Sequence, residues 1–172
     1  MMRLVVIGAG MASGRMLEQL FDAGFTGQVT LFNGEPRGNY NRLMLSPVLS
    51  GEKTYEQIVT HDDDWYAAHA VDCRFGESIV KIDRSNRIVF SNHGGVPYDK
   101  LVIATGSAPF IIPVAGKELS GVVTYRDLED TNAMIEAGLA GQNAVVIGGG
   151  LLGLEAAAGM AARGAKVTVI HL

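Results

Sequence analysis

Two glycine-rich segments have the residue types and spacing that bind the phosphates of a dinucleotide. The first, Gly8-Ala9-Gly10-Met11-Ala12-Ser13-Gly14, follows the apolar run Leu4 to Ile7. In such a turn the first glycine permits a tight bend, and the second lets the backbone approach a pyrophosphate at a helix N-terminus. Ser13 takes the third position of the pattern in place of Gly or Ala, and it is still small. The segment therefore predicts a nucleotide site, with an ordinary glycine-rich turn as the alternative.

Glu35 follows the first turn about 20 residues later, where an acid can accept hydrogen bonds from a ribose diol. A solvated turn residue before Pro36 is the competing interpretation of Glu35.

The second segment, Gly148-Gly149-Gly150-Leu151-Leu152-Gly153, matches the full glycine pattern. It lies between a predicted strand, Ala144 to Ile147, and an Ala-rich helix, Leu151 to Ala162, and a strand from Lys166 to Ile170 follows. The position that would identify the nucleotide holds His171 rather than an acid, so NADH and NADPH both remain open.

The first segment has the same order of elements. Apolar residues at helical spacing predict a helix from Met11 to Ala23, and a strand from Gln28 to Phe32 comes next. Further along, Ser78 to Asp83 and Arg87 to Ser91 alternate like antiparallel strands.

The middle of the chain ends in another predicted strand and a loop. Gly94-Gly95 is predicted to turn the chain back into a buried strand from Tyr98 to Thr105. Pro109 and Pro113 then place a domain boundary near residue 113, giving domains 1–113 and 114–172.

The second predicted domain stops directly after its second strand, whereas a parallel α/β domain needs more strands and covering helices. We therefore expect a fragment that exposes apolar surface on strands 144–147 and 166–170. Exposed surface of this kind predicts self-association, so a homo-oligomer is a further expectation.

Composition excludes several other classes of protein. The 172 residues are 48% hydrophobic, and 14 Lys plus Arg against 18 Asp plus Glu give a net charge of -4. No basic run suggests nucleic acid, and no segment resembles a membrane span or signal peptide, so we expect a cytoplasmic protein. A single cysteine excludes an internal disulfide and a two-cysteine redox centre.

Other residues with chemical potential have simpler interpretations. Cys73 lies in a probable strand, Val71 to Phe75, and is predicted to be a buried apolar residue rather than a nucleophile. Asp62-Asp63-Asp64 suits a helix start. No metal site is predicted, because the histidines show no ligand spacing with acids or cysteines: His61, His69, His93 and His171.

The order of the first turn, the segment Ala104-Thr105-Gly106 and the second turn resembles that of the two-dinucleotide-binding-domain flavoproteins. These include the pyridine nucleotide-disulfide oxidoreductases and the ferredoxin and rubredoxin reductases. The resemblance implies an α/β fold: a Rossmann-like FAD domain with a small antiparallel β-meander, then the truncated start of a second Rossmann-like NAD(P) domain.

Finer features are similar to the N-terminal region of the large subunit of assimilatory NAD(P)H-dependent nitrite reductases. The segments that carry this likeness are Glu35 to Arg42, Leu45 to Gly51, Asp64-Trp65-Tyr66, Gly148 to Glu155, and Val169-Ile170-His171-Leu172.

The resemblance also implies which residues bind the cofactors. FAD would lie against the first turn, with Glu35 at its ribose, Ile79 near its adenine and further residues along its length: Gly8, Gly10, Ala12, Ser13, Arg42, Ala104, Thr105, Gly106 and Arg126. NAD(P)H would bind at Gly148, Gly150, Gly153 and Glu155. No residue is assigned as catalytic.

Some positions depart from the pattern of these families. Related ferredoxin reductases usually have a lysine where this chain has Pro47, and many relatives have an arginine where it has Ala108. The disulfide-reductase branch needs a cysteine pair that Asn39 to Ser50 lacks.

The first functional hypothesis is a module that passes electrons from NAD(P)H through flavin to later redox domains, as in nitrite reduction to ammonia. Siroheme and an iron–sulfur cluster would be bound only by domains outside this chain. The alternatives are a stand-alone ferredoxin- or rubredoxin-reductase-like protein that serves a small electron carrier, and a nucleotide-binding fragment without turnover.

Overall fold

The computed structural model describes residues 1–171, so Leu172, the last residue of the Val-x-His-Leu segment, lies outside the described residues. The chain forms two compact units. The first comprises Met1–Tyr40 and Val59–Gly106, and the second comprises Asn41–Ile58 and Ser107–Leu172.

The first unit is built on a parallel sheet with the strand order β3-β2-β1-β7. These strands are β1 (Arg3–Ile7), β2 (Gln28–Asn33), β3 (Val71–Phe75) and β7 (Lys100–Ile103). Ile7 pairs with both Phe32 and Ile103, so the carboxyl ends of β1, β2 and β7 are level. In a parallel α/β sheet this edge is where ligands bind.

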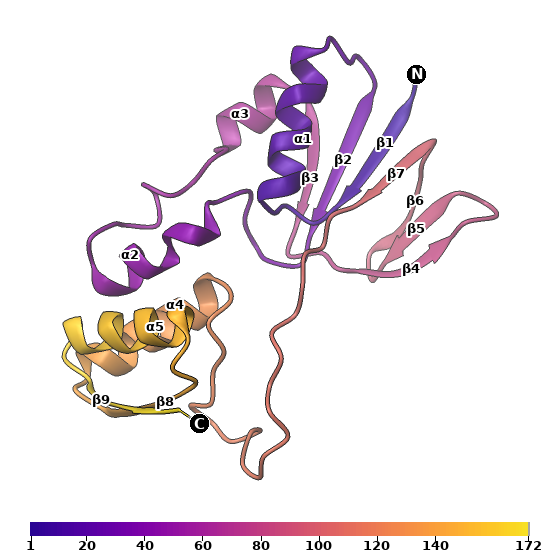
Figure 1. Cartoon of the computed structure of the whole chain (residues 1–172). Helices are drawn as coiled ribbons and strands as arrows, with labels where there is room; N and C mark the ends of the chain where they lie inside the picture. Colours follow the sequence, from indigo (N-terminus) through magenta and orange to yellow (C-terminus); the bar gives the residue numbers. More distant parts are fainter. Residues whose placement is uncertain (172) are drawn as a thin grey trace. The chain divides into compact units, whose positions relative to one another are not determined.

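Different layers cover the two faces of this sheet (Figure 1). On one face, Leu4, Val6 and Leu31 pack against Leu17 of helix α1 (Met11–Asp22) and Tyr66 of α3 (Asp63–Ala68). On the other face, Val5, Ile7 and Phe32 pack against Val89 and Tyr98. The alternation along β1 thus buries both faces, as its continuous apolar run predicts.

Val89 belongs to a three-stranded antiparallel sheet made by β4 (Ile79–Asp83), β5 (Ile88–Ser91) and β6 (Gly94–Pro97). The predicted first two strands are confirmed. The prediction for Gly94-Gly95 was wrong in part, because these glycines form the start of β6 and pair with Ser91 and Phe90 rather than only turning the chain. The meander turns at residues 92–93 instead.

The acidic cluster begins α3, as predicted. Asp62 is the N-cap residue, and its side chain accepts a hydrogen bond from the Trp65 backbone N–H at 2.9 Å. Asp63 and Asp64 occupy the first turn, where negative charge is favourable to the helix dipole.

An ion pair ties the start of β1 to the residue before β7. The backbone and guanidinium of Arg3 both donate to the Asp99 carboxylate, at 2.7 and 2.9 Å. These hydrogen bonds from Arg3 hold the pKa of Asp99 well below its ordinary value. Asp99 also donates its backbone N–H to the Arg3 carbonyl, which aligns the two strands.

The second unit contains the predicted strand, helix and strand as β8 (Asn143–Ile147), α5 (Leu151–Ala162) and β9 (Lys166–Ile170). The two strands pair in parallel from Asn143–Lys166 to Ile147–Ile170. Helix α4 (Leu128–Leu139) precedes β8 and starts at the N-cap residue Asp127.

Residues 41–58 contribute a short helix to this second unit. After a single 3-10 turn, η1 (Arg42–Met44), helix α2 (Leu45–Ser50) packs on α4 and α5. Leu49 is fully buried, and a Cβ on Gly159 would come within 2.6 Å of its side chain. Arg163 donates to the carbonyls of Leu49 and Val48, at 2.7 and 2.8 Å, and so satisfies acceptors at the end of α2.

No helix within residues 1–171 combines the length and apolar character needed to cross a bilayer.

We predict that Leu31→Ala lowers the free energy of unfolding by about 2–5 kcal/mol, because Leu31 is fully buried in the first unit. Trp65 is the only tryptophan and packs against the same cluster, so its fluorescence during urea unfolding gives the measurement. Val80→Ala, at a side chain that is 72% exposed, is the control and should change stability by less than about 0.5 kcal/mol. Equal effects of the two substitutions would contradict this account of the core.

The second unit exposes apolar side chains on its strands, including Val145 at 60% and Ile147 at 63%. We predict concentration-dependent self-association through this surface, detected by light scattering coupled to size-exclusion chromatography. Replacing both residues by lysine should shift the protein toward monomer. A wild-type protein that stays monomeric at high concentration would refute the prediction.

Candidate functional site

A pocket of about 250 Å³ opens at the carboxyl ends of β1 and β2. Its lining includes three of the residues predicted to bind FAD, which are Gly8, Ile79 and Thr105. The remaining lining residues are Ile7, Phe32, Asn33, Gly34, Glu77 and Ser78. The parallel sheet therefore brings the first turn, the start of β4 and the end of β7 to one place.

The backbone conformation and the packing both require glycine at position 8. Its φ is +102°, and a Cβ at this position would lie 2.4 Å from the Ala104 carbonyl oxygen. Its N–H also donates to the Phe32 carbonyl at 2.7 Å. Only glycine adopts this conformation at such close contact without strain.

Neither the backbone conformation nor the packing requires glycine at position 10. Its φ is -90°, which any residue adopts, and a Cβ there would meet only the Ala104 oxygen, at 4.0 Å. Gly10 is the N-cap of α1 and has no side chain that caps the helix. A glycine that neither conformation nor packing demands leaves space at which a ligand could approach the backbone closely.

Ser13 fits at the third position of the turn because its hydroxyl has a hydrogen-bond partner. The side chain is buried at 1% exposure, and its Oγ donates to the Gly10 carbonyl at 2.9 Å. Ala12, by contrast, is exposed in the first turn of α1.

Glu35 is held by a buried tyrosine. The hydroxyl of Tyr40, which is 2% exposed, donates to the Glu35 carboxylate at 2.8 Å. The Glu35 carbonyl accepts from the Gly76 N–H at 2.9 Å, just before β4. Its side chain is thereby fixed near the carboxyl end of β2 as an acceptor.

Two residues of this pocket were missed by the sequence analysis. Asn33, at the end of β2, accepts from the Ala9 N–H at 3.4 Å and donates to the Arg37 carbonyl at 2.7 Å. The buried carboxylate of Glu77 accepts a short hydrogen bond from Ser91, and His93 lies 3.5 Å from it. An asparagine directly after the predicted strand Gln28 to Phe32 was a usable signal, but nothing local marked Glu77.

The second turn has the same glycine arrangement as the first, and it also has glycine at the third position of the pattern. Gly148 has a φ of +115°, and a Cβ on Gly153 would lie 1.9 Å from the Gly148 carbonyl oxygen. Gly150 has a φ of -74°, and a Cβ there would meet nothing within 4 Å. Gly150 is thus the counterpart of Gly10, with open space where a side chain would stand.

His171 lies against this second turn. The Gly149 N–H donates to its Nδ1 at 3.3 Å, and a Cβ on Gly149 would come within 2.9 Å of the ring. The residue that replaces an acid at the end of β9 therefore supports the turn.

Glu155 is part of a hydrogen-bonded chain in the second unit. Ser46 of α2 donates to its carboxylate at 2.5 Å, and the Tyr125 hydroxyl donates to Ser46 at 3.1 Å. Burial raises the pKa of Tyr125, which keeps its hydroxyl protonated as a donor. The structure thus connects the predicted NAD(P)H residue to residues 41–58.

Arg42 and Arg126 also meet in the second unit, where the Arg42 guanidinium donates to the Arg126 carbonyl at 3.2 Å. The residues predicted to bind the flavin therefore belong partly to the first unit and partly to the second. Those in the first unit are Gly8, Gly10, Ala12, Ser13, Glu35, Ile79, Ala104, Thr105 and Gly106.

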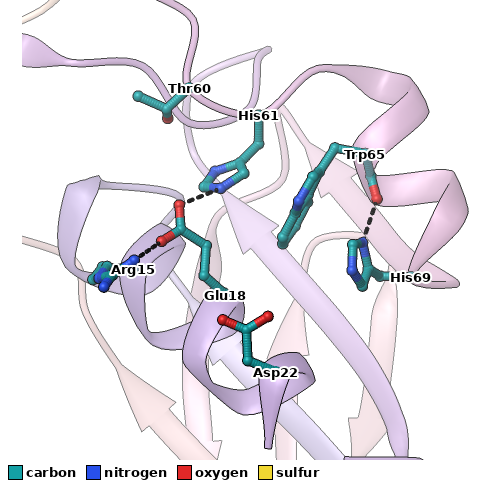
Figure 2. Close-up of a pocket in the computed structure, with 7 residues that line it drawn as sticks. All are labelled: Arg15, Glu18, Asp22, Thr60, His61, Trp65 and His69. Carbon is teal, nitrogen blue, oxygen red and sulfur yellow. Dashed lines mark hydrogen bonds and ion pairs between the residues drawn. The ribbon is translucent and has the colours of Figure 1, made fainter. Parts of the chain in front are cut away.

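A second pocket, of about 270 Å³, is lined by residues of α1 and α3 and by Thr60, His61 and His69. Figure 2 shows Glu18 between Arg15 and His61, and Trp65 between the rings of His61 and His69. The Glu18 carboxylate lies 2.5 Å from the Arg15 guanidinium and 2.9 Å from His61 Nε2. The hydrogen bond from Arg15 lowers the pKa of Glu18, so an ionised carboxylate balances the guanidinium. We interpret this polar and aromatic cluster as the connection between α3 and α1.

Comparison with known proteins identifies the family. The model of the pyridine nucleotide-disulphide oxidoreductases matches residues 2–172. The chain belongs to this family. Its first unit has the parallel sheet and antiparallel meander of the FAD-binding Rossmann domain in ferredoxin-reductase-like flavoproteins, which confirms the predicted fold class.

Relatives come from both branches that the sequence suggests. The NAD(P)H nitrite reductase of Bacillus subtilis (strain 168) is 43% identical over 172 residues, 99% of this chain and 21% of the relative. The ferredoxin–NAD(+) reductase component of the biphenyl dioxygenase system of Paraburkholderia xenovorans (strain LB400) is 34% identical over 170 residues, 98% of this chain and 41% of the relative.

Among solved structures, the covalent putidaredoxin reductase–putidaredoxin complex matches with a TM-score of 0.85 and 30% identity, covering 97% of this chain and 41% of that chain. The chain therefore spans about a fifth of the length of the nitrite reductase and two fifths of the ferredoxin reductases. It is an FAD/NAD(P)H oxidoreductase domain of the nitrite reductase and ferredoxin reductase group.

The 172 residues hold a single cysteine, Cys73, and therefore no cysteine pair of the kind that the disulfide-reducing branch needs. Cys73 is half-buried in β3, and burial, assisted by Asp72 and Asp63, raises the pKa of its thiol to about 11. Within residues 1–171, no cluster of three or more His, Cys, Asp or Glu side chains could hold a metal ion.

We predict that Cys73 reacts slowly with iodoacetamide at pH 7. Because the raised pKa keeps the thiol neutral, the fraction of reactive thiolate is small and grows only as pH approaches about 11. Alkylation rates followed by mass spectrometry from pH 7 to 10 should rise about tenfold per pH unit. Rapid labelling at pH 7 would show that the thiol is activated.

Proposed function

We propose that this chain is the FAD- and NAD(P)H-binding part of an assimilatory nitrite reductase large subunit, with FAD at the first glycine turn and the nicotinamide nucleotide at the second. The observation that carries the proposal is the pair Gly10 and Gly150. Each is glycine where backbone conformation and packing would both allow a side chain. Two such positions in one chain support two dinucleotides.

The residues around each turn suit these ligands. The Gly10–Met11 end of α1 offers unpaired backbone N–H groups to a pyrophosphate. Glu35, oriented by Tyr40, can accept the ribose hydroxyls, while Ile79 lines the pocket for the adenine. In the second unit Gly148, Gly150 and Gly153 present the N-terminus of α5, and Glu155 is held by Ser46.

When bound, NAD(P)H and FAD supply hydride transfer and one-electron release. The part of this chain is to bind, orient and shield the two nucleotides. This division of work needs no acid/base residue, and we assign none. We place the FAD residues in 1–113, apart from Arg126, and the NAD(P)H residues in 114–172.

The nitrite reductase assignment is supported by the 43% identity to the Bacillus subtilis enzyme. We infer that electrons leave to siroheme and iron–sulfur centres in domains outside this chain. A ferredoxin- or rubredoxin-reductase-like function, serving a small carrier protein, is the second candidate, and the TM-score of 0.85 to putidaredoxin reductase favours it.

The proposal is tested first on the wild-type chain. Purified protein should contain flavin or take up FAD, and NADH or NADPH should bleach the flavin absorbance without air. Dye reduction by the loaded protein then measures turnover. Flavin binding without bleaching would leave only the nucleotide-binding hypothesis, and a protein that cannot bind FAD would refute the proposal.

We predict that Gly10→Ala and Gly150→Ala separate the two sites. Gly10→Ala should raise the Kd for FAD at least tenfold, because its methyl group occupies space that the pyrophosphate needs. Gly150→Ala should leave the Kd for FAD unchanged and raise the NAD(P)H concentration needed for half-maximal bleaching. Neither should lower the free energy of unfolding by more than about 1 kcal/mol, the range for changes at a helix N-cap.

Each glycine variant is the matched control of the other. Titration of apoprotein by flavin fluorescence gives the first measurement, and anaerobic bleaching gives the second. If both variants weakened both ligands equally, the assignment of one nucleotide to each turn would be wrong.

A further inference from the structure

Three donors meet the carbonyl oxygen of Gly10 at the start of α1. The Gly14 N–H donates at 3.0 Å as the first bond of the helix, and the Ser13 hydroxyl donates at 2.9 Å. The third donor is distant in sequence, because the side-chain amide of Asn39 donates at 2.5 Å. A backbone carbonyl has two lone pairs, so this oxygen is fully used.

Asn39 is fixed on every side within the first unit. Its side chain is fully buried, and its Oδ1 accepts a short hydrogen bond from the Tyr66 hydroxyl. The Asn39 N–H donates to the same hydroxyl at 3.0 Å, and its carbonyl accepts from the Thr60 N–H at 3.0 Å. With its backbone and its side-chain oxygen held in this way, the amide nitrogen can aim only at Gly10.

Gly14 leaves the room that this contact needs. A Cβ on Gly14 would lie 2.9 Å from the Asn39 amide nitrogen and 3.0 Å from the His61 ring. Glycine at position 14 therefore allows the hydrogen bond between Asn39 and Gly10. The position of Gly14 next to the glycine pattern did not indicate this role.

The consequence for the turn follows from peptide geometry. In a trans peptide the carbonyl and the N–H point in opposite directions, so a carbonyl held toward Asn39 turns the Met11 N–H outward from the end of the helix. Hydrogen bonds to the carbonyl also strengthen the donor at the other end of the same peptide. Met11 N–H is one of the helix N-terminal donors available to an anion.

We propose that Asn39, supported by Tyr66, is a positioning residue that orients the Gly10–Met11 peptide for the pyrophosphate of FAD. This role rests on the proposed binding of FAD at the first turn. In this role the buried Asn39–Tyr66 pair contributes to the affinity for FAD and not only to the stability of the fold. Asn39 itself does not touch the cofactor.

The test is the Kd for FAD in two variants of the chain. Asn39→Leu has a similar volume and no donor, and we expect its Kd to rise about tenfold, equivalent to about 1.4 kcal/mol. Asn39→Asp keeps an acceptor for Tyr66 and can donate to Gly10 only when protonated. Its affinity for FAD, relative to wild type, should therefore be higher at pH 6 than at pH 8.

Val29→Ala is the matched control, since Val29 is almost fully buried in the first unit but lies near the start of β2, at the opposite end of that strand from the pocket. It should lower the free energy of unfolding and leave the Kd for FAD unchanged, provided that urea unfolding shows each protein folded under assay conditions. A pH-dependent affinity in Asn39→Asp is not expected from a purely structural role, and it decides the question if Asn39→Leu does not fold.

Two failures are distinguishable. If wild type binds no FAD, the proposed function fails. If wild type binds FAD, and a folded Asn39→Leu binds within twofold of it, the role of Asn39 is overturned while the proposed function stands. With Asn39→Leu unfolded, an Asn39→Asp affinity that follows wild type at every pH would likewise overturn it.

Discussion

The arrangement of the first unit depends on the close approach of Gly8 to the carbonyl of Ala104. A Cβ at Gly8 would lie 2.4 Å from that oxygen, so the turn after β1 and the end of β7 can meet only at a glycine. The parallel register of β1 with β2 and β7 makes this approach possible, because it ends the three strands at one level. Ile79 of the antiparallel meander and Glu77, just before it, also line the pocket.

The two glycine turns have the same arrangement but accept different residues at the third position of the pattern. In the second turn a Cβ on Gly153 would lie 1.9 Å from the Gly148 oxygen, so only glycine is accepted there. In the first turn Ser13 takes the corresponding position, and its hydroxyl is satisfied by the Gly10 carbonyl. The same carbonyl receives the Asn39 amide, so the first turn is supported by side chains where the second is supported by close backbone packing and by His171.

The second unit is built from segments far apart in sequence. Residues 41–58 join it because Leu49 packs into the space left by Gly159 and because Arg163 caps the carbonyls that end α2. This arrangement brings Ser46 to Glu155 and Arg42 to Arg126. Residues 41–58, which follow the Glu35 segment closely in sequence, thus lie with the βαβ unit of the second turn.

The sequence by itself determined the elements whose signals are local. Glycine spacing, apolar runs and helix-start acids predicted β1, α1, the second βαβ unit and the start of α3, because each depends on neighbouring residues and on backbone sterics. Only the tertiary structure decided which distant side chains complete the sites: Asn39 at Gly10, Glu77 in the pocket and Ser46 at Glu155. Local pattern also misassigned Gly94-Gly95, since pairing with β5 makes these glycines a strand. These features depend on hydrogen bonds between residues that only the folded chain brings together, and no local sequence pattern specifies such a pair.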